Sequence, residues 1–294
     1  MATLATAFPR TLPQTRMLGA SFSWWLLIAP AVILMLAFYA FPLAEVLWIS
    51  VTEPQPGFGN YERLLTSAAL QRVWTTTLRI CVITTAITLV AGYVVAYALV
   101  SAPPRLQRWM FVCVLLPLWI SVLVRAFAWV TLLRSQGVVN QALLSLGVID
   151  QPLRLIWNEF GIAVGMVHYM IPYAVLPLYA SMRDIDPRLV PAARGLGATR
   201  LEAFRRVFLP LTLPGIVAAT VLVFIFSLGF YVTPAILGGG RTLMVAEYIK
   251  LQILDLIRWG VGTMMATTLL VAVVVVLAIF ARIVDFRRLF GSRH

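Results

Sequence analysis

Charged residues are scarce in this chain of 294 residues, of which 12% are charged and 61% are hydrophobic. An ordinary soluble domain carries about twice that share of charge. The scarcity excludes such a domain and favours a chain whose apolar runs lie in a bilayer. We therefore expect an all-α membrane protein, because the runs have the length of membrane-crossing helices.

Reactive side chains are equally rare. Lysine occurs once, at Lys250, and no GxxxxGK[ST] sequence is present, so the chain lacks a phosphate-binding loop of that kind. The two cysteines, Cys81 and Cys113, fall in apolar runs and predict neither a disulfide nor a metal site. No HExxH sequence, Cys/His cluster or acid pair offers metal or acid–base chemistry. We expect no catalytic residue, metal or cofactor on this chain.

Six apolar runs are long enough to cross a bilayer, for which about 20 residues are needed. They are 17–44, 80–104, 109–133, 160–182, 207–240 and 259–281. The pattern predicts a polytopic protein with six transmembrane helices in one domain, 23–289, between tails at 1–22 and 290–294. Small residues at Thr85, Thr88, Gly92 and Ala96 share one face of the second run, which predicts close packing against another helix.

Basic residues divide unevenly between the two sides of these runs. With the N-terminus inside, the inner segments hold fourteen basic residues and the outer segments hold eight. Because basic residues favour the cytoplasmic side, we expect both termini to be cytoplasmic. The formal charge of +12 is thus a sign of membrane topology, and we expect a lipid environment and no nucleic-acid partner.

The most distinctive segment is polar, rich in arginine and placed between the fourth and fifth runs. Residues 191–210 read PAARGLGATRLEAFRRVFLP, with helical patterns on both sides of Gly195 and Gly197. This sequence resembles the coupling loop of bacterial ABC-importer permeases, whose pattern is Glu-Ala-Ala, then a Gly, an apolar residue and Leu-Pro. Pro191 stands where that pattern has Glu. We call residues 184–209 the arginine-rich loop.

Two further stretches, 116–129 (LPLWISVLVRAFAW) and 227–240 (SLGFYVTPAILGGG), resemble permeases of the spermidine/putrescine branch of ABC importers. The resemblance implies a type I ABC importer (MetI-like) permease fold in the bacterial inner membrane. It also implies a second permease subunit that is a different chain, two cytoplasmic ATPase subunits that bind ATP and Mg, and an external solute-binding protein. The residues it assigns to ATPase coupling are Pro191, Ala192, Ala193, Arg194, Gly197, Ala198, Phe204, Leu209 and Pro210.

Candidates for the translocation pathway are the few polar and aromatic side chains of the runs. An arginine in mid-membrane costs roughly 3 kcal/mol, so Arg125 is expected to face a protein partner or the pathway. His168 is expected either to form an interhelical hydrogen bond or to line the pathway. The remaining candidates are aromatic, namely Trp119, Trp129, Tyr169, Tyr173, Phe230 and Tyr231.

The solute is expected to be small, polar and nitrogenous. The resemblance favours a polyamine, but the interiors of the runs hold no Asp or Glu that would replace the water around a cation. Because Arg125 is basic, an amino-acid-like or carboxylated solute remains the alternative to a polyamine. The alternatives from other classes are a secondary transporter or channel without an ATPase, and a membrane-embedded enzyme or assembly factor.

Overall fold

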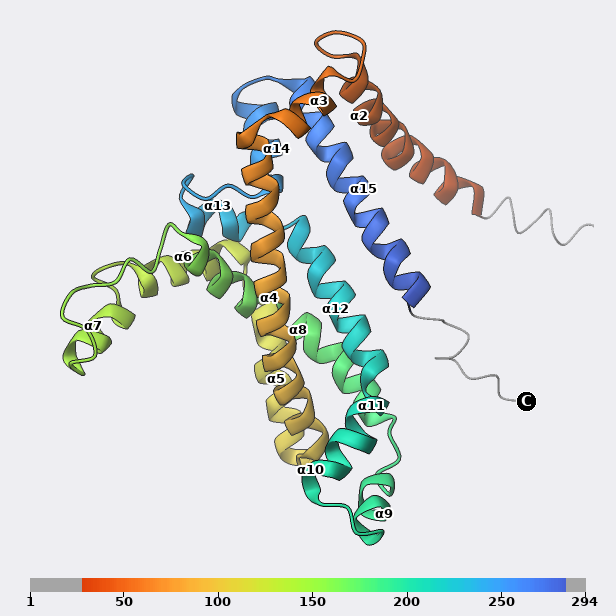
Figure 1. The fold of residues 1–294 in the computed structure, drawn as a ribbon, viewed down its shortest axis with the longest axis vertical. Coiled ribbons are helices and arrows are strands. Elements are labelled where there is room, and N and C mark those ends of the chain that lie inside the picture. Colours follow the sequence, from red (N-terminus) through yellow and green to blue (C-terminus); the bar gives the residue numbers. More distant parts are fainter. Residues whose placement is uncertain (1–27, 284–294) are drawn as a thin grey trace, which may run out of the picture. The chain divides into compact units, whose positions relative to one another are not determined.

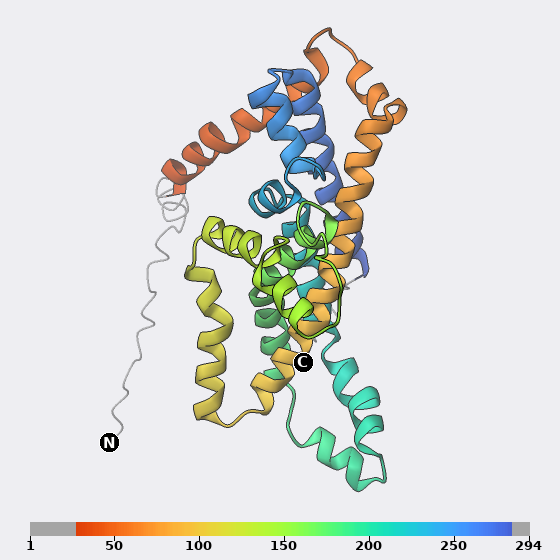
Figure 2. The ribbon, with the colours of Figure 1, turned by 90° about the vertical axis from the view of Figure 1, so that its left-hand side faces the viewer.

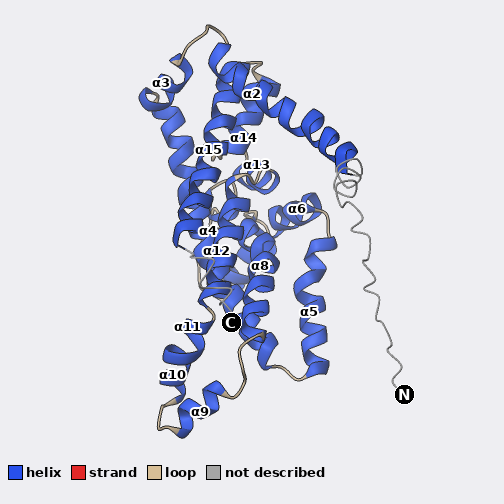
Figure 3. Ribbon diagram, turned by 90° about the vertical axis from the view of Figure 1, so that its right-hand side faces the viewer, coloured by secondary structure: helices blue, strands red, loops and turns tan. Residues whose placement is uncertain are grey.

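The computed structural model describes residues 28–283 of the chain (Figure 1). Within that range, the regular structure consists of helices joined by turns and loops (Figure 3). The chain divides into two compact units, Met1–Trp48 and Ile49–His294, and each is described by itself. The expected tails, 1–22 and 290–294, lie outside the described residues, as does the beginning of the first apolar run.

An apolar helix from Ile28 to Thr52 fills the described part of the first unit and continues past its boundary. It contains a π-helical turn, η1 (Leu36–Ala40), followed by α2 (Phe41–Thr52). Pro42 has no N–H to donate, which accounts for the wider turn that precedes it. Side chains such as Phe38 are largely exposed, as expected for a helix surrounded by lipid.

The second unit begins with the short helix α3 (Gly59–Thr66) and the 34-residue helix α4 (Ala68–Ser101). The helices that follow are α5 (Pro104–Trp119), α6 (Val122–Leu133), α7 (Val138–Ser145), α8 (Glu159–Arg183), α9 (Leu189–Gly195), α10 (Arg200–Ala203), η2 (Phe204–Phe208), α11 (Leu209–Leu211), α12 (Leu213–Leu228), α13 (Val232–Gly238), α14 (Val245–Lys250), η3 (Leu251–Asp255) and α15 (Trp259–Ile283). By length and composition, the described residues contain five helices able to cross a membrane, or six if one bent pair counts as a span.

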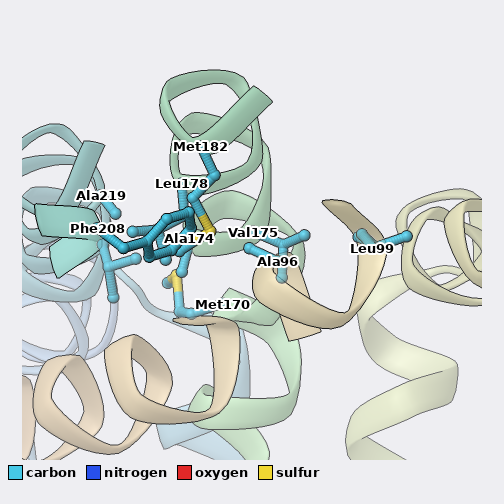
Figure 4. Close-up of a cluster of buried hydrophobic side chains, with 10 residues drawn as sticks. Ala96, Leu99, Met170, Ala174, Val175, Leu178, Met182, Phe208 and Ala219 are labelled. Carbon is cyan, nitrogen blue, oxygen red and sulfur yellow. The ribbon is translucent and has the colours of Figure 1, made fainter. Parts of the chain in front are cut away.

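Helices α4, α8 and α12 pack against one another and form the core of the second unit. Figure 4 shows side chains from all three helices meeting in one buried cluster. The small-residue face of α4 lies in this contact, since a Cβ added to Gly92 would stand 2.9 Å from the Cβ of Ala174. Thr85, Thr88 and Ala96 are buried as well. The prediction that this face packs against another helix is confirmed.

Two of the predicted runs are not single straight helices. The run 109–133 is divided into α5 and α6 at Ile120 and Ser121, three residues after Pro117. Pro117 has no backbone N–H to donate, and its ring crowds the preceding turn. Both effects weaken the end of α5 and explain its early end. The run 207–240 is likewise divided, because α12 ends at Leu228 and α13 forms a separate short helix.

The helices place the arginine-rich loop and α14 at opposite ends of the second unit. Figures 1 and 3 both show α9 and α10 at the end where α4 and α8 finish, with α14 near the start of α4. Figure 2 shows α5 turning back after a short connection at the same end as the loop. The loop therefore lies beside the connection between α4 and α5.

Candidate functional site

The arginine-rich loop folds as two short helices joined at a glycine. Asp186 accepts a hydrogen bond from the backbone N–H of Arg188 (2.8 Å), just before α9 begins. The chain reverses at Gly197, whose φ of +95° is a conformation that side-chain-bearing residues rarely adopt. The glycine-jointed helix pair expected from the sequence is thus present in the structure.

A reciprocal pair of hydrogen bonds starts the second helix. The Thr199 hydroxyl accepts from the backbone N–H of Glu202 (3.2 Å), while the Glu202 carboxylate accepts from the backbone N–H of Thr199 (3.0 Å). The bond from the Thr199 backbone, and then that from its hydroxyl, hold the pKa of Glu202 below its ordinary value. This capping box satisfies N–H groups that the first turn of α10 leaves free.

Aromatic side chains fasten the loop to α4. The Phe204 ring packs edge-on against Tyr97 at a centroid distance of 5.9 Å, and Phe208 does the same at 5.4 Å. Phe208 belongs to the buried cluster of Figure 4, and Phe204 packs against that cluster. The structure therefore places Phe204 toward the long helices, and the outer surface of the loop is formed by other residues.

Leucine side chains stand on that outer surface. Leu196, at the tip between the two helices, is 91% exposed, and Leu201 is 63% exposed. Sequence reasoning missed Leu196, although an apolar residue between two glycines in a polar loop was a usable signal. Of the residues assigned to coupling, Pro191, Ala192, Arg194, Gly197 and Pro210 are exposed, while Ala193, Ala198, Phe204 and Leu209 are partly buried.

A second candidate site surrounds Arg125 on α6. Its guanidinium carbon lies 4.4 Å from the centroid of the Tyr169 ring on α8, a cation–π contact. The residue is only 9% exposed, and its Nε and Nη1 atoms are buried without a hydrogen-bond acceptor. A buried guanidinium with two unused donors is suited to bind a carboxylate or a carbonyl group.

Five other predicted residues gather near this arginine. The Trp129 indole N–H donates to His168 Nδ1 (3.2 Å), and the Tyr169 ring lies 4.5 Å from Phe230 and 5.7 Å from Tyr173 between centroids. We call the six residues, Arg125, Trp129, His168, Tyr169, Tyr173 and Phe230, the Arg125 cluster. Helices α6 and α8 and the link between α12 and α13 supply them.

The two remaining predicted residues have other surroundings. Trp119 ends α5 and is 80% exposed, and Tyr231, which follows Phe230, is close enough to Lys250 of α14 to affect the pKa of that lysine. The hydrogen bond from Lys250 to Asp255 raises the pKa of that lysine. Within the described residues, no three His, Cys, Asp or Glu side chains group together in a way that could hold a metal ion.

Residues 88–289 match the family described as binding-protein-dependent transport system inner membrane component. The chain belongs to this family. It is 34% identical over 223 residues to the spermidine/putrescine transport system permease protein PotB of Salmonella typhimurium (strain SL1344), covering 76% of this chain and 77% of that protein. PotB of Escherichia coli (strain K12) is 33% identical, with 76% and 81% covered.

A solved structure supports the fold independently. The chain superimposes with a TM-score of 0.76, at 20% identity, on a chain of the bacterial alginate ABC transporter in complex with an alginate pentasaccharide-bound periplasmic protein. The alignment covers 92% of this chain and 98% of the other. The expected ABC-importer permease fold is therefore confirmed. Membership of the family makes the chain a multi-pass inner-membrane transport subunit.

Proposed function

We propose that this permease subunit uses the arginine-rich loop to couple a separate cytoplasmic ATPase to inward transport of a small polar nitrogenous solute. Two ATPase subunits, which bind ATP and Mg, a second permease that is a different chain, and an external solute-binding protein complete the transporter. The observation that carries the coupling proposal is the exposed helix pair α9–α10 with Leu196 at its tip. Family membership favours this importer over a secondary transporter or channel.

The two sides of the loop have separate roles in this proposal. The outer side, with Leu196 and Arg194, enters a groove on the ATPase. The inner side, through Phe204 and Phe208, is fastened to α4 by contacts with Tyr97. Closure of the ATPase dimer would therefore move α4 with the loop, which supplies a route from ATP binding to alternating access.

Substitutions at Gly197 test the coupling step. Gly197→Ala and Gly197→Trp both force a side-chain-bearing residue into the strained backbone angle at this position. Only Trp also adds bulk, and within this chain that bulk has room, because no atom lies within 4 Å of a Cβ added at Gly197. We expect Trp to reduce both transport and co-purification of the ATPase far more than Ala, at equal amounts of inserted protein. Equal effects of the two substitutions would mean that backbone strain alone causes the loss, and would contradict docking of the ATPase at Gly197.

Topology follows from placing the loop in the cytoplasm. The uneven division of basic residues supports this orientation and cytoplasmic termini. With Cys81 and Cys113 replaced by serine, a cysteine at Thr199 should react with an impermeant thiol reagent only when the cytoplasmic side is open. A cysteine at Gln55 should react in intact spheroplasts. The opposite pattern would reverse the proposed orientation.

A polyamine is the favoured solute. The names of the PotB relatives support it, and the aromatic faces of Tyr173 and Phe230 are suitable for cation–π contacts with ammonium groups. Arg125 favours a second candidate, a nitrogenous solute with a carboxylate, because its Nε and Nη1 atoms lack acceptors. An ammonium about 5 Å from that guanidinium would be repelled by roughly 3 kcal/mol at an effective dielectric constant near 20.

Uptake by the complete transporter separates the two solutes. Labelled putrescine and 4-aminobutyrate would be offered to cells that carry all subunits, with wild-type chain or with Arg125→Gln. If a polyamine is the solute, putrescine uptake should be saturable and ATP-dependent, and Arg125→Gln should leave it intact or raise it. Uptake of 4-aminobutyrate alone, lost in Arg125→Gln, would replace the polyamine with the carboxylated solute.

A further inference from the structure

Three neighbouring cavities share lining residues, beginning beside the arginine-rich loop, and we call them together the groove. A cavity of about 690 Å³ lies among the ends of α4 and α8, the start of α5 and the loop helices. A second, of about 450 Å³, shares Tyr97, Arg200 and Phe204 with the first. A third, of about 360 Å³, shares Tyr93, Val94 and Phe204 with the second and continues along α4 and α12. The shared residues place the three cavities next to one another along α4.

The end of the groove nearest the loop is positively charged. Arg183, Arg194 and Arg200 line the first cavity, and Asp186 is the one acid among its lining residues. In the part of the chain that the structure describes, none of these three arginines takes part in a salt bridge. The charges of Arg183 and Arg200, which the coupling proposal does not use, are thus available to a negatively charged group that enters the cavity, and Arg200 also lines the second cavity.

The far end of the groove is apolar. Apart from the Tyr93 hydroxyl, the lining of the third cavity is hydrocarbon and aromatic, from Leu89, Val90, Val94, Leu178, Leu209 and Ile216. The Tyr93 hydroxyl is itself engaged in a hydrogen bond with Thr212 (3.1 Å). An occupant of this end therefore gains only apolar contact, while an occupant of the other end meets arginines.

We propose that this groove binds one anionic phospholipid, with its phosphate at Arg200 and an acyl chain along the apolar part of α4 and α12. The lining of the groove follows the order of groups in a phospholipid. Charged residues lie at the loop, the aromatic rings of Tyr97 and Phe204 come next, and hydrocarbon side chains lie beyond them. Basic pockets at the cytoplasmic ends of transmembrane helices bind anionic head groups in this way. A cationic solute would be repelled by the same arginines.

Such a lipid would touch both the loop and the long helices that the loop must move. Phe204 lines all three cavities and packs against the buried cluster, so a bound acyl chain would contact the aromatic ring that fastens the loop to α4. The lipid would then help to hold η2 against α4. This inference needs the membrane location of the chain but not the identity of the solute.

Native mass spectrometry of the purified complete transporter, supplied with phosphatidylglycerol or phosphatidylcholine, is the direct test. Wild type should retain phosphatidylglycerol in preference to phosphatidylcholine. Arg200→Gln should weaken that retention about fivefold, as expected for the loss of one basic contact. Arg205→Gln is the matched control, because Arg205 is exposed, lies on the same loop and lines none of the three cavities.

A second variant tests the acyl-chain end without touching the charges. Val94 is 63% exposed, so Val94→Trp should fold and fill the groove, whereas Val124→Trp, at a 61% exposed site on α6, should leave it open. Val94→Trp should reduce lipid retention and Val124→Trp should not. Equal retention of the two lipids by wild type, or unchanged retention in both Arg200→Gln and Val94→Trp, would overturn the proposal. Because lipid retention requires no transport, neither result depends on the coupling or solute proposals.

Discussion

Glu247 carries a carboxyl group that the fold buries without an adequate partner. It lies on α14, outside the candidate membrane spans, where α14 packs against α15 and α4. The residue is 9% exposed, and its Oε2 atom has no hydrogen-bond donor. Lys250, whose charge acts on Glu247, instead pairs with Asp255 through bonds of 2.6 and 2.8 Å. Burial therefore disfavours the ionised form of Glu247.

The pKa of Glu247 sets the magnitude and the sign of this effect on stability. Desolvation raises the pKa of Glu247 from 4.5 to about 7, against a smaller opposing effect of Lys250. The difference corresponds to about 3 kcal/mol. Because the folded pKa is the higher one, stability is greatest below pH 4.5 and is lost as the pH rises through about 7. Glu247→Gln keeps the shape, removes the charge and should remove this loss.

Thermal unfolding of the detergent-purified chain between pH 5 and pH 8 measures the effect. Near pH 5 the two proteins should unfold at similar temperatures. At pH 8, Glu247→Gln should be more stable by about 2 to 3 kcal/mol, or about 3 to 5 °C for a chain of this length. Glu62→Gln is the control, since it removes an exposed carboxyl group on α3 and should change stability by at most about 0.5 kcal/mol. A difference between wild type and Glu247→Gln that does not change with pH would refute the reasoning.

Three further outcomes are expected. Phe204→Asp should lower uptake about tenfold or more while the ATPase still co-purifies, because the loop loses its fastening to α4; loss of the ATPase would contradict this. Gly92→Val should cost about 1 to 3 kcal/mol through collision with Ala174, seen as loss of the monodisperse peak in size-exclusion chromatography. Arg79→Gln removes an exposed ion pair with Glu159 and should change stability by less than about 1 kcal/mol.

Much of the fold could be predicted because its causes are local. In lipid, a run of about 20 apolar residues forms a helix, because only a helix pairs all of its backbone groups internally. This is why α8 and α15 agree with the predicted runs, whereas α4 begins at Ala68, twelve residues before its run. The loop helices also have local causes. The capping box of Thr199 and Glu202 and the turn at Gly197 depend on residues only a few positions apart.

The inner and outer sides of the loop could not be distinguished in the same way. Phe204 and Leu196 are both apolar residues in a polar segment, and nothing in their spacing marks one for burial. Their environments differ because Tyr97, on a distant helix, meets Phe204 and leaves Leu196 exposed. Phe204, which the resemblance assigns to ATPase coupling, thus contacts another helix of the same chain, while Leu196 stands exposed.

The Arg125 cluster depends on a break that hydropathy does not reveal. As one helix, the run 109–133 would carry Arg125 onward along the direction of α5. The chain instead turns after Pro117, and Figure 3 shows α6 lying across the direction of α5. That turn brings Arg125 to the ring of Tyr169, which supplies a cation–π contact but no acceptor for Nε and Nη1. Since an unpaired buried guanidinium is costly, measuring which solute requires Arg125 tests whether the cluster binds a carboxylated solute.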